Sequence, residues 1–378
     1  MKSLCIASLL LVTSFLSFSQ PEASSQKLEI SFNKNIELLG LAYFIGFEAE
    51  NIETKTIEVE GKTMPKKSWH NYGYTLYNKY KDYISSENLA QSFTVADHLW
   101  LDYLNAFLLQ LEPVPNAALT ADIPVQYYLN FSKSKDTLEA KNHAETFLNG
   151  LNAFSKEIDF DVYLEQSKPY YNTVIAEIKQ DLPDNNFISV MEQFYHKDFD
   201  RYLLIPSLTI PKGMGFAVKN SDNALTEVYN IFGALGIQQF EDASDLHMGF
   251  NYRDKLRELS VHEFGHSFVN PVVARLPESA FTETAHLFPP VKEVMANQGY
   301  TSWKACVYEH FVRAGEIIIA EKTGTEEQVN ALKETYVKER QFIYLPKILE
   351  ELHTYENGDH LEYYDVVVAA MNRLKQIK

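Results

Sequence analysis

The sequence predicts an α+β fold that is mainly helical and contains a small mixed or antiparallel sheet. Apolar residues recur at helical spacing along most of the 378-residue chain. Strand-like runs cluster between residues 202 and 235, and a helix that carries His262 and His266 follows them. Because elements that are consecutive in sequence usually lie together in space, we expect the sheet to pack beside this helix.

Residues 1–19 differ in composition from the rest of the chain. Lys2 provides a positive start, residues 4–16 are mostly apolar, and the small residues Ser17 and Ser19 follow. A membrane-spanning helix needs about 20 apolar residues, so this shorter run predicts a cleaved signal peptide and not an anchor. We therefore expect an exported protein, periplasmic or secreted, with no membrane insertion after cleavage.

The chain after this leader, residues 20–378, predicts a single domain, because no repeat and no low-complexity linker divides it. Two closely packed lobes, residues 20–200 and 201–378, are the alternative. The net charge is −17, and it becomes −18 when Lys2 leaves with the signal peptide. Nucleic acids require a basic surface and anionic membranes attract basic segments, so the charge excludes nucleic acid as a partner and disfavours membrane surfaces.

The predicted elements change in type along the chain. Residues 28–32 alternate between apolar and polar and predict a strand, whereas residues 36–47 fit either a helix or a buried strand. Residues 69–111 and 137–203 have mainly helical spacing, with a proline-rich loop between them. Strand-like runs and helical stretches complete the chain, with strands at 202–210, 215–219 and 227–235 and helices at 252–269, 303–322, 325–352 and 359–377.

Residues 262–266 have the sequence HEFGH. His262 and His266 are four residues apart, so they project from one face of the helix and can bind a single metal ion. Zinc is well suited by two imidazoles and a carboxylate, with a fourth position left for water. We therefore expect one zinc ion as cofactor, with Glu263 as the general base that deprotonates the bound water.

Other residues of this helix have predicted supporting roles. Asn251 can cap its start, and the Asn270-Pro271 pair predicts its end. Glu258 and Asn270 each lie one turn from a histidine and can hydrogen-bond its outer nitrogen, or each can be an exposed residue near a helix end. Gly265 costs about 1 kcal/mol relative to alanine in a helix interior, which predicts a close-packed neighbour at that turn.

The third ligand has to come from elsewhere in the chain. Val269 and Val272 stand where the extended metzincin motif has glycine and histidine, so that class is excluded. Residues 303–322 are apolar almost all round and are predicted to be buried, where charges need a partner or a metal. We therefore predict Glu309 as the ligand, held by Arg313, with a purely structural salt bridge between the two as the alternative. The other candidates, with Glu293 as the runner-up, are Glu278, Glu283, Glu293, Glu316 and His286.

Residues 262–271 (HEFGHSFVNP) and 300–314 (YTSWKACVYEHFVRA) resemble a family of exported bacterial proteins that carries a domain of unknown function and is gluzincin-like. Residues 35–39 (NIELL) resemble the start of the same family. The resemblance implies a zincin-like fold and no particular substrate. It also implies three zinc ligands and a catalyst, namely His262, His266, Glu309 and Glu263.

These observations together predict an exported zinc-dependent metallopeptidase that hydrolyses peptide bonds by Glu-assisted attack of zinc-bound water. In enzymes of the zincin type an edge strand pairs with an extended peptide or protein substrate, and residues 228–235 are our first choice for it. The alternatives are a zinc hydrolase of a non-peptide amide or ester and a non-catalytic, zinc-containing binding module. Spacing does not single out an oxyanion-stabilising residue among Tyr300, His310, His353, His360, Tyr363 and Tyr364.

Overall fold

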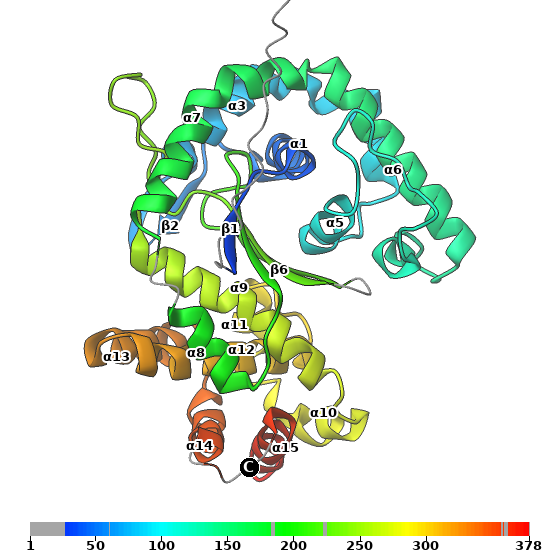
Figure 1. Cartoon of the computed structure of the whole chain (residues 1–378). Helices are drawn as coiled ribbons and strands as arrows, with labels where there is room; N and C mark the ends of the chain where they lie inside the picture. Colours follow the sequence, from blue (N-terminus) through cyan, green and yellow to red (C-terminus); the bar gives the residue numbers. More distant parts are fainter. Residues whose placement is uncertain are drawn as a thin grey trace, which may run out of the picture.

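A small mixed sheet lies between two groups of helices in the computed structural model of the chain (Figure 1). The structure describes residues 27–59, 61–182, 186–221, 225–356, 358 and 362–377. Figure 1 shows most helices of the N-terminal half on one side of the sheet and the helices of the C-terminal half on the other. The predicted α+β class, mainly helical with a small mixed sheet, is confirmed. The predicted signal peptide lies outside the described residues.

The order of the strands determines which strand is available to a ligand. Within the described residues the sheet has the order β1 (Leu28–Ile30), β4 (Arg201–Pro206), β6 (Thr226–Phe232) and β5 (Gly215–Ser221). Strands β1 and β6 run parallel to β4, and β5 runs antiparallel to β6 with Phe216 opposite Ile231. The prediction that residues 228–235 form the edge strand is wrong, because β6 is paired on both sides. In the described part of the chain, β5 is an edge strand.

In the described part of the first half, the regular elements are helices apart from β1 and a short hairpin of β2 (Thr56–Val59) and β3 (Lys62–Pro65), which was not predicted. Residues 36–47, which fitted a helix or a strand, are helical. The Asn33 side chain accepts hydrogen bonds from the backbone N–H groups of Asn35 and Ile36 and thereby caps the helix start. The elements are α1 (Lys34–Tyr43), the π-helix η1 (Phe44–Glu48), α2 (Lys66–Trp69), α3 (Asn71–Tyr80), α4 (Glu87–Thr94), α5 (Leu101–Leu108), α6 (Thr137–Glu157), α7 (Phe160–Gln180) and α8 (Asn186–Tyr195).

The second half is helical after the sheet. Its helices are α9 (Arg253–Val273), α10 (Glu278–Thr284), α11 (Lys292–Asn297), α12 (Trp303–Thr323), α13 (Glu326–Glu334), the π-helix η6 (Thr335–Glu339), α14 (Leu345–Glu356) and α15 (Tyr363–Leu374). The helix predicted over residues 325–352 is in fact interrupted. Gln341 has a φ of 60°, which ends the helix, and Phe342 next to it is buried in the core. The apolar spacing continues on both sides of this turn, so periodicity alone does not reveal the break.

Helix α9 differs from its predicted form at both ends. Asn251 does not cap it, because the helix begins after Tyr252 with no side-chain cap. Pro271 lies inside the helix, which continues to Val273. Proline removes one backbone donor, but this loss falls in the last turn, where the Ala274 N–H still reaches the Asn270 carbonyl at 2.9 Å. Asn270 therefore stays in helical register one turn beyond His266.

The apolar face of α9 fixes its orientation against the sheet. The ring of Phe264 meets Tyr202 of β4 edge-on at 5.1 Å between centroids, and the ring of Phe268 stacks on Tyr195 of α8 at 4.7 Å. These contacts belong to one hydrophobic core that extends from Leu28 to Leu374. Within the described residues, no helix combines the length and the apolar character needed to cross a membrane.

Candidate metal centre

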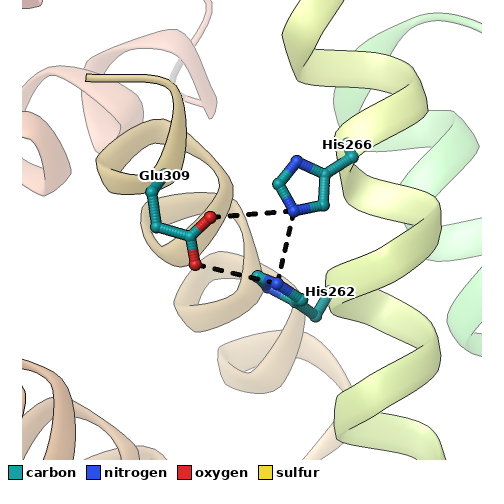
Figure 2. A group of neighbouring side chains, drawn as sticks. All are labelled: His262, His266 and Glu309. Atoms are coloured by element: carbon teal, nitrogen blue, oxygen red, sulfur yellow. Dashed lines mark hydrogen bonds and ion pairs between the residues drawn. The ribbon is translucent and has the colours of Figure 1, made fainter. Parts of the chain in front are cut away.

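Three side chains from two helices converge on one point (Figure 2). His262 and His266 project from α9 toward Glu309 of α12, which packs beside it. The Nε2 atoms of the two histidines lie 3.3 Å apart. Glu309 Oε1 is 3.7 Å from Nε2 of His262, and Glu309 Oε2 is 3.7 Å from Nε2 of His266. These three residues, which are the predicted ligands, form a group that could hold a metal ion.

The spacing of the three side chains fits a small tetrahedral cation. Bonds of about 2.0–2.1 Å around a tetrahedral zinc ion place its ligand atoms roughly 3.3–3.4 Å apart. The observed separations of 3.3, 3.7 and 3.7 Å are within a few tenths of an ångström of that value. Two imidazole nitrogens and one carboxylate also form a donor set that zinc favours. The site therefore suits zinc in both geometry and chemistry.

The outer nitrogens of the two histidines have partners that set their orientation. Nδ1–H of His262 donates to Glu316 Oε1 at 2.5 Å, and Nδ1–H of His266 donates to Asn270 Oδ1 at 3.3 Å. These hydrogen bonds leave both Nε2 atoms free to act as ligands. The predicted contact of Asn270 is confirmed. The predicted role of Glu258 is wrong, because its side chain is exposed and the outer nitrogen of His262 faces α12, where Glu316 lies.

Arg313 connects the two carboxylates of α12. Its Nε donates to Glu309 Oε1 at 2.8 Å, and its Nη1 donates to Glu316 Oε1 at 3.3 Å. The predicted Glu309–Arg313 contact is confirmed, and Glu309 faces the histidines at the same time. The Tyr336 hydroxyl, from η6, donates to Glu316 and accepts from Arg313 Nη1 at 3.1 Å. Burial and Arg313 would lower the pKa of His262, but the charges of Glu316 and Glu309 outweigh them and raise it.

Electrostatics keep the third ligand ionised. Burial alone would raise the pKa of Glu309, but the positive charge of Arg313 and the two nearby histidines outweigh this and hold the pKa well below its usual range. Burial lowers the pKa of His266 to about 4, so its ring is neutral near pH 7. An ionised carboxylate and a neutral imidazole are the forms that bind a metal ion.

Glu263, the predicted general base, is 6% exposed and lines the same cleft as the ligands. Burial raises the pKa of Glu263 to about 7. Strand β5 begins directly against it. A Cβ atom at Gly215 would lie 2.7 Å from Glu263 Oε1 and 2.7 Å from Leu259, so a larger residue would displace the carboxylate. At Gly265 a Cβ would meet only Val312, at an ordinary 3.6 Å, and the close neighbour predicted there is not present.

The metal centre opens into a cleft of about 940 Å³. Helix α9 and Glu309 form one wall, β5 and the loop before it form a second, and η1, α4 and α5 contribute a third. Among the described oxyanion candidates, Tyr300 is the one that lines the cleft and lies near enough to Glu309 to help lower the pKa of that carboxyl. His310 is instead buried against aromatic side chains, and His353 pairs with Glu321 on the surface. The others do not line the cleft or lie outside the described residues, namely Tyr363, Tyr364 and His360.

The remaining third-ligand candidates lie away from the histidines. Glu293 is exposed on α11, and His286 Nε2 hydrogen-bonds the Ile377 carbonyl at 2.8 Å. Glu278 and Glu283 pair with lysines on the surface. Sequence reasoning missed Glu316 as the partner of His262, although its position seven residues after Glu309 placed it on the same helix face. Tyr336 and Gly215 had no comparable signal, because they reach the site from separate elements.

Comparison with known families covers nearly the whole described chain. Residues 28–367 match a family described as a domain of unknown function, DUF4932. The chain belongs to this family. In this DUF4932 member, the matched region includes both helices of the metal centre and the N-terminal helices across the cleft. No curated protein matches the chain, and no solved structure matches it. Membership in DUF4932 assigns no activity, so functional arguments rest on the site.

Proposed function

We propose that this protein is an exported zinc-dependent metallopeptidase that hydrolyses peptide bonds. The observation that carries the proposal is the convergence of His262, His266 and Glu309 beside Glu263 in one cleft. A structural metal site has no need of a fourth, unliganded carboxylate facing the same space. The proposed export rests on the sequence of residues 1–19, which predicts a signal peptide.

Each side chain has a distinct role in this proposal. His262, His266 and Glu309 hold the zinc ion, which when bound acts as a Lewis acid on the carbonyl and the attacking water. Glu263 takes a proton from that water and passes it to the leaving amine. Arg313 keeps Glu309 in place, and Glu316 orients His262. We assign to Tyr300, which lines the same cleft, the donation of a hydrogen bond to the oxygen on which negative charge develops.

The form of the cleft favours peptides over small amides or esters. Strand β5 lines the cleft, and in the described part of the chain its outer edge is unpaired. Such an edge offers backbone N–H and C=O groups to an extended peptide, which can add to the sheet as a further strand. A small-molecule ester would use none of these groups. A non-peptide amide or ester is the alternative substrate, and a hydrolysis assay distinguishes it from a peptide.

The test uses zinc-loaded protein and its Glu263→Gln variant with unfolded protein substrates and an unbiased peptide mixture. We expect the wild type to contain one zinc ion per chain and to cleave peptides. The variant should retain zinc and lose activity by about 10²-fold or more, because the general base is gone. Unchanged turnover in a variant that keeps its zinc would refute the role of Glu263. Zinc binding with hydrolysis of esters alone, or with no hydrolysis, would refute the peptidase assignment.

A further inference from the structure

The cleft wall opposite the metal helix exposes large aromatic side chains. Phe47 is 50% exposed and Trp100 is 70% exposed, and both line the cleft. Phe47 belongs to η1, and Trp100 is the residue directly before α5. Aromatic side chains as large as these are usually buried in a folded protein. Where they remain exposed in a concavity, they mark a binding site.

The chain holds Phe47 in a fixed position. Its ring stacks on Tyr43 at 5.6 Å between centroids and meets Phe93 edge-on at 5.6 Å. Phe93 in turn packs against Phe147 in the core at 6.2 Å. The π-helix widens the last turn of α1 at this point, a feature that is frequent at functional sites. A side chain such as Phe47 that is already ordered costs little entropy when a ligand binds it.

The wall lies where a substrate side chain would meet it. Strand β5 and Glu263 line the same cleft, and successive side chains of an extended peptide point to opposite sides. With its backbone along β5, a peptide would direct alternate side chains to the two faces of the sheet, and one of these sets would point toward this wall. Asp97 and Asp102 line this wall as well, and Lys219 of β5 also lines the cleft, so the cleft contains charges of both signs.

We propose that the cleft selects peptides with a bulky apolar side chain next to the scissile bond, and that Phe47 and Trp100 bind this side chain. The proposal rests on the proposed peptidase function, since it names the substrate class of the same site. Phe47 and Trp100 determine specificity through substrate binding, whereas Glu263 takes part in hydrolysis of the peptide bond.

The first experiment measures kcat/KM on peptides that are identical except for one residue next to the cleaved bond, which is Phe, Ala or Glu. For the wild type we expect a preference of about 10- to 100-fold for Phe over Ala, the value of burying one aromatic side chain. Phe47→Ala and Trp100→Ala should each reduce that preference to a few-fold. The control is Leu138→Ala, because Leu138 is 69% exposed on α6 and does not line the cleft. It should leave the preference unchanged.

The second experiment separates binding from hydrolysis. The same peptides are titrated into the zinc-loaded Glu263→Gln variant, with and without Phe47→Ala, and binding is followed by calorimetry. If the Phe peptide binds more tightly than the others and Phe47→Ala removes this difference, the inference is supported. If in addition no peptide is cleaved, only the proposed peptidase function fails. Cleavage with no Phe preference, or with a preference that survives both substitutions in the wall, overturns the inference. Binding of neutral oligosaccharides and not of peptides overturns it as well.

Discussion

At the scale of single residues, the candidate metal centre depends on side chains that contact the candidate ligands from behind. His262 owes its orientation to Glu316, which Tyr336 and Arg313 hold in turn. The sequence identified all three candidate ligands, because an i, i+4 histidine pair can share one ion and a buried glutamate requires a metal or a charged partner. It assigned the outer partner of His262 incorrectly, because Glu258 and Glu316 are both plausible until the rotation of α9 against α12 is known.

Substitution of Glu316 should weaken metal binding. Glu316→Gln removes the charge that orients His262, so we expect the zinc dissociation constant to rise by about 10- to 100-fold. Competition against a chromogenic chelator measures this constant. Glu258→Gln is the matched control, because Glu258 is exposed and the outer nitrogen of His262 bonds Glu316 instead. Equal zinc affinity in the two variants would contradict the role of Glu316.

A second buried carboxyl, Glu37 of α1, should make stability depend on pH. Burial raises the pKa of Glu37 to about 7, although its Oε2 accepts a hydrogen bond from Tyr171 at 2.8 Å and its Oε1 one from the Leu208 N–H at 3.2 Å. The folded state then retains a proton that the unfolded chain releases near pH 4.5. Folding therefore loses stability as the pH rises from about 4.5 to 7, and the loss persists above pH 7.

Glu37→Gln should remove this dependence, because the amide does not titrate. We expect the unfolding free energy of the wild type to fall by about 3 kcal/mol relative to the variant between pH 4 and pH 8. Urea unfolding at both pH values measures the difference. A constant difference between the two proteins across this range would show that Glu37 is ionised in the folded state.

At the scale of elements, the site depends on how β5 meets α9. Periodicity predicted both elements, but it did not identify the edge strand, since strand order is a matter of pairing between distant segments. The cost of a glycine in a helix interior predicted a close contact at Gly265, and the structure has such a contact at Gly215 instead. A glycine in a helix interior is visible in the sequence, whereas a glycine that allows a strand to approach a carboxylate is visible only after folding.

Substitution by alanine should lower activity at Gly215 and raise stability at Gly265. Gly215→Ala would push Glu263 from its position, and we expect kcat/KM to fall by about 10- to 100-fold with zinc content unchanged. Gly265→Ala meets only an ordinary contact with Val312, so it should stabilise α9 by up to about 1 kcal/mol. Steady-state kinetics, zinc analysis and thermal unfolding measure these effects. Full activity in Gly215→Ala would show that β5 does not position the base.

At the scale of the whole molecule, the residues of the candidate metal centre come from the two longest helices of the C-terminal half, α9 and α12. A metal ion that binds only the folded state stabilises it by RT ln(1 + [L]/Kd), about 4 kcal/mol at a thousandfold excess over Kd. We expect zinc to raise Tm by several degrees and a chelator to reverse the rise. Glu309→Gln is the control, and its Tm should be insensitive to zinc. An equal shift in both proteins would mean that the ion binds elsewhere.

The sequence by itself determined the α+β class, most of the helices, the three candidate ligands and the candidate general base. Apolar periodicity predicts helices and strands, and a charged residue within an apolar segment predicts a charged partner or a metal. Both patterns can be recognised within one segment of the chain. Tertiary structure alone decided that β5 is an edge strand, that Glu316 orients His262 and that Phe47 and Trp100 line the cleft of the metal centre. Each of these depends on how distant elements pack against one another, and no local pattern encodes that packing.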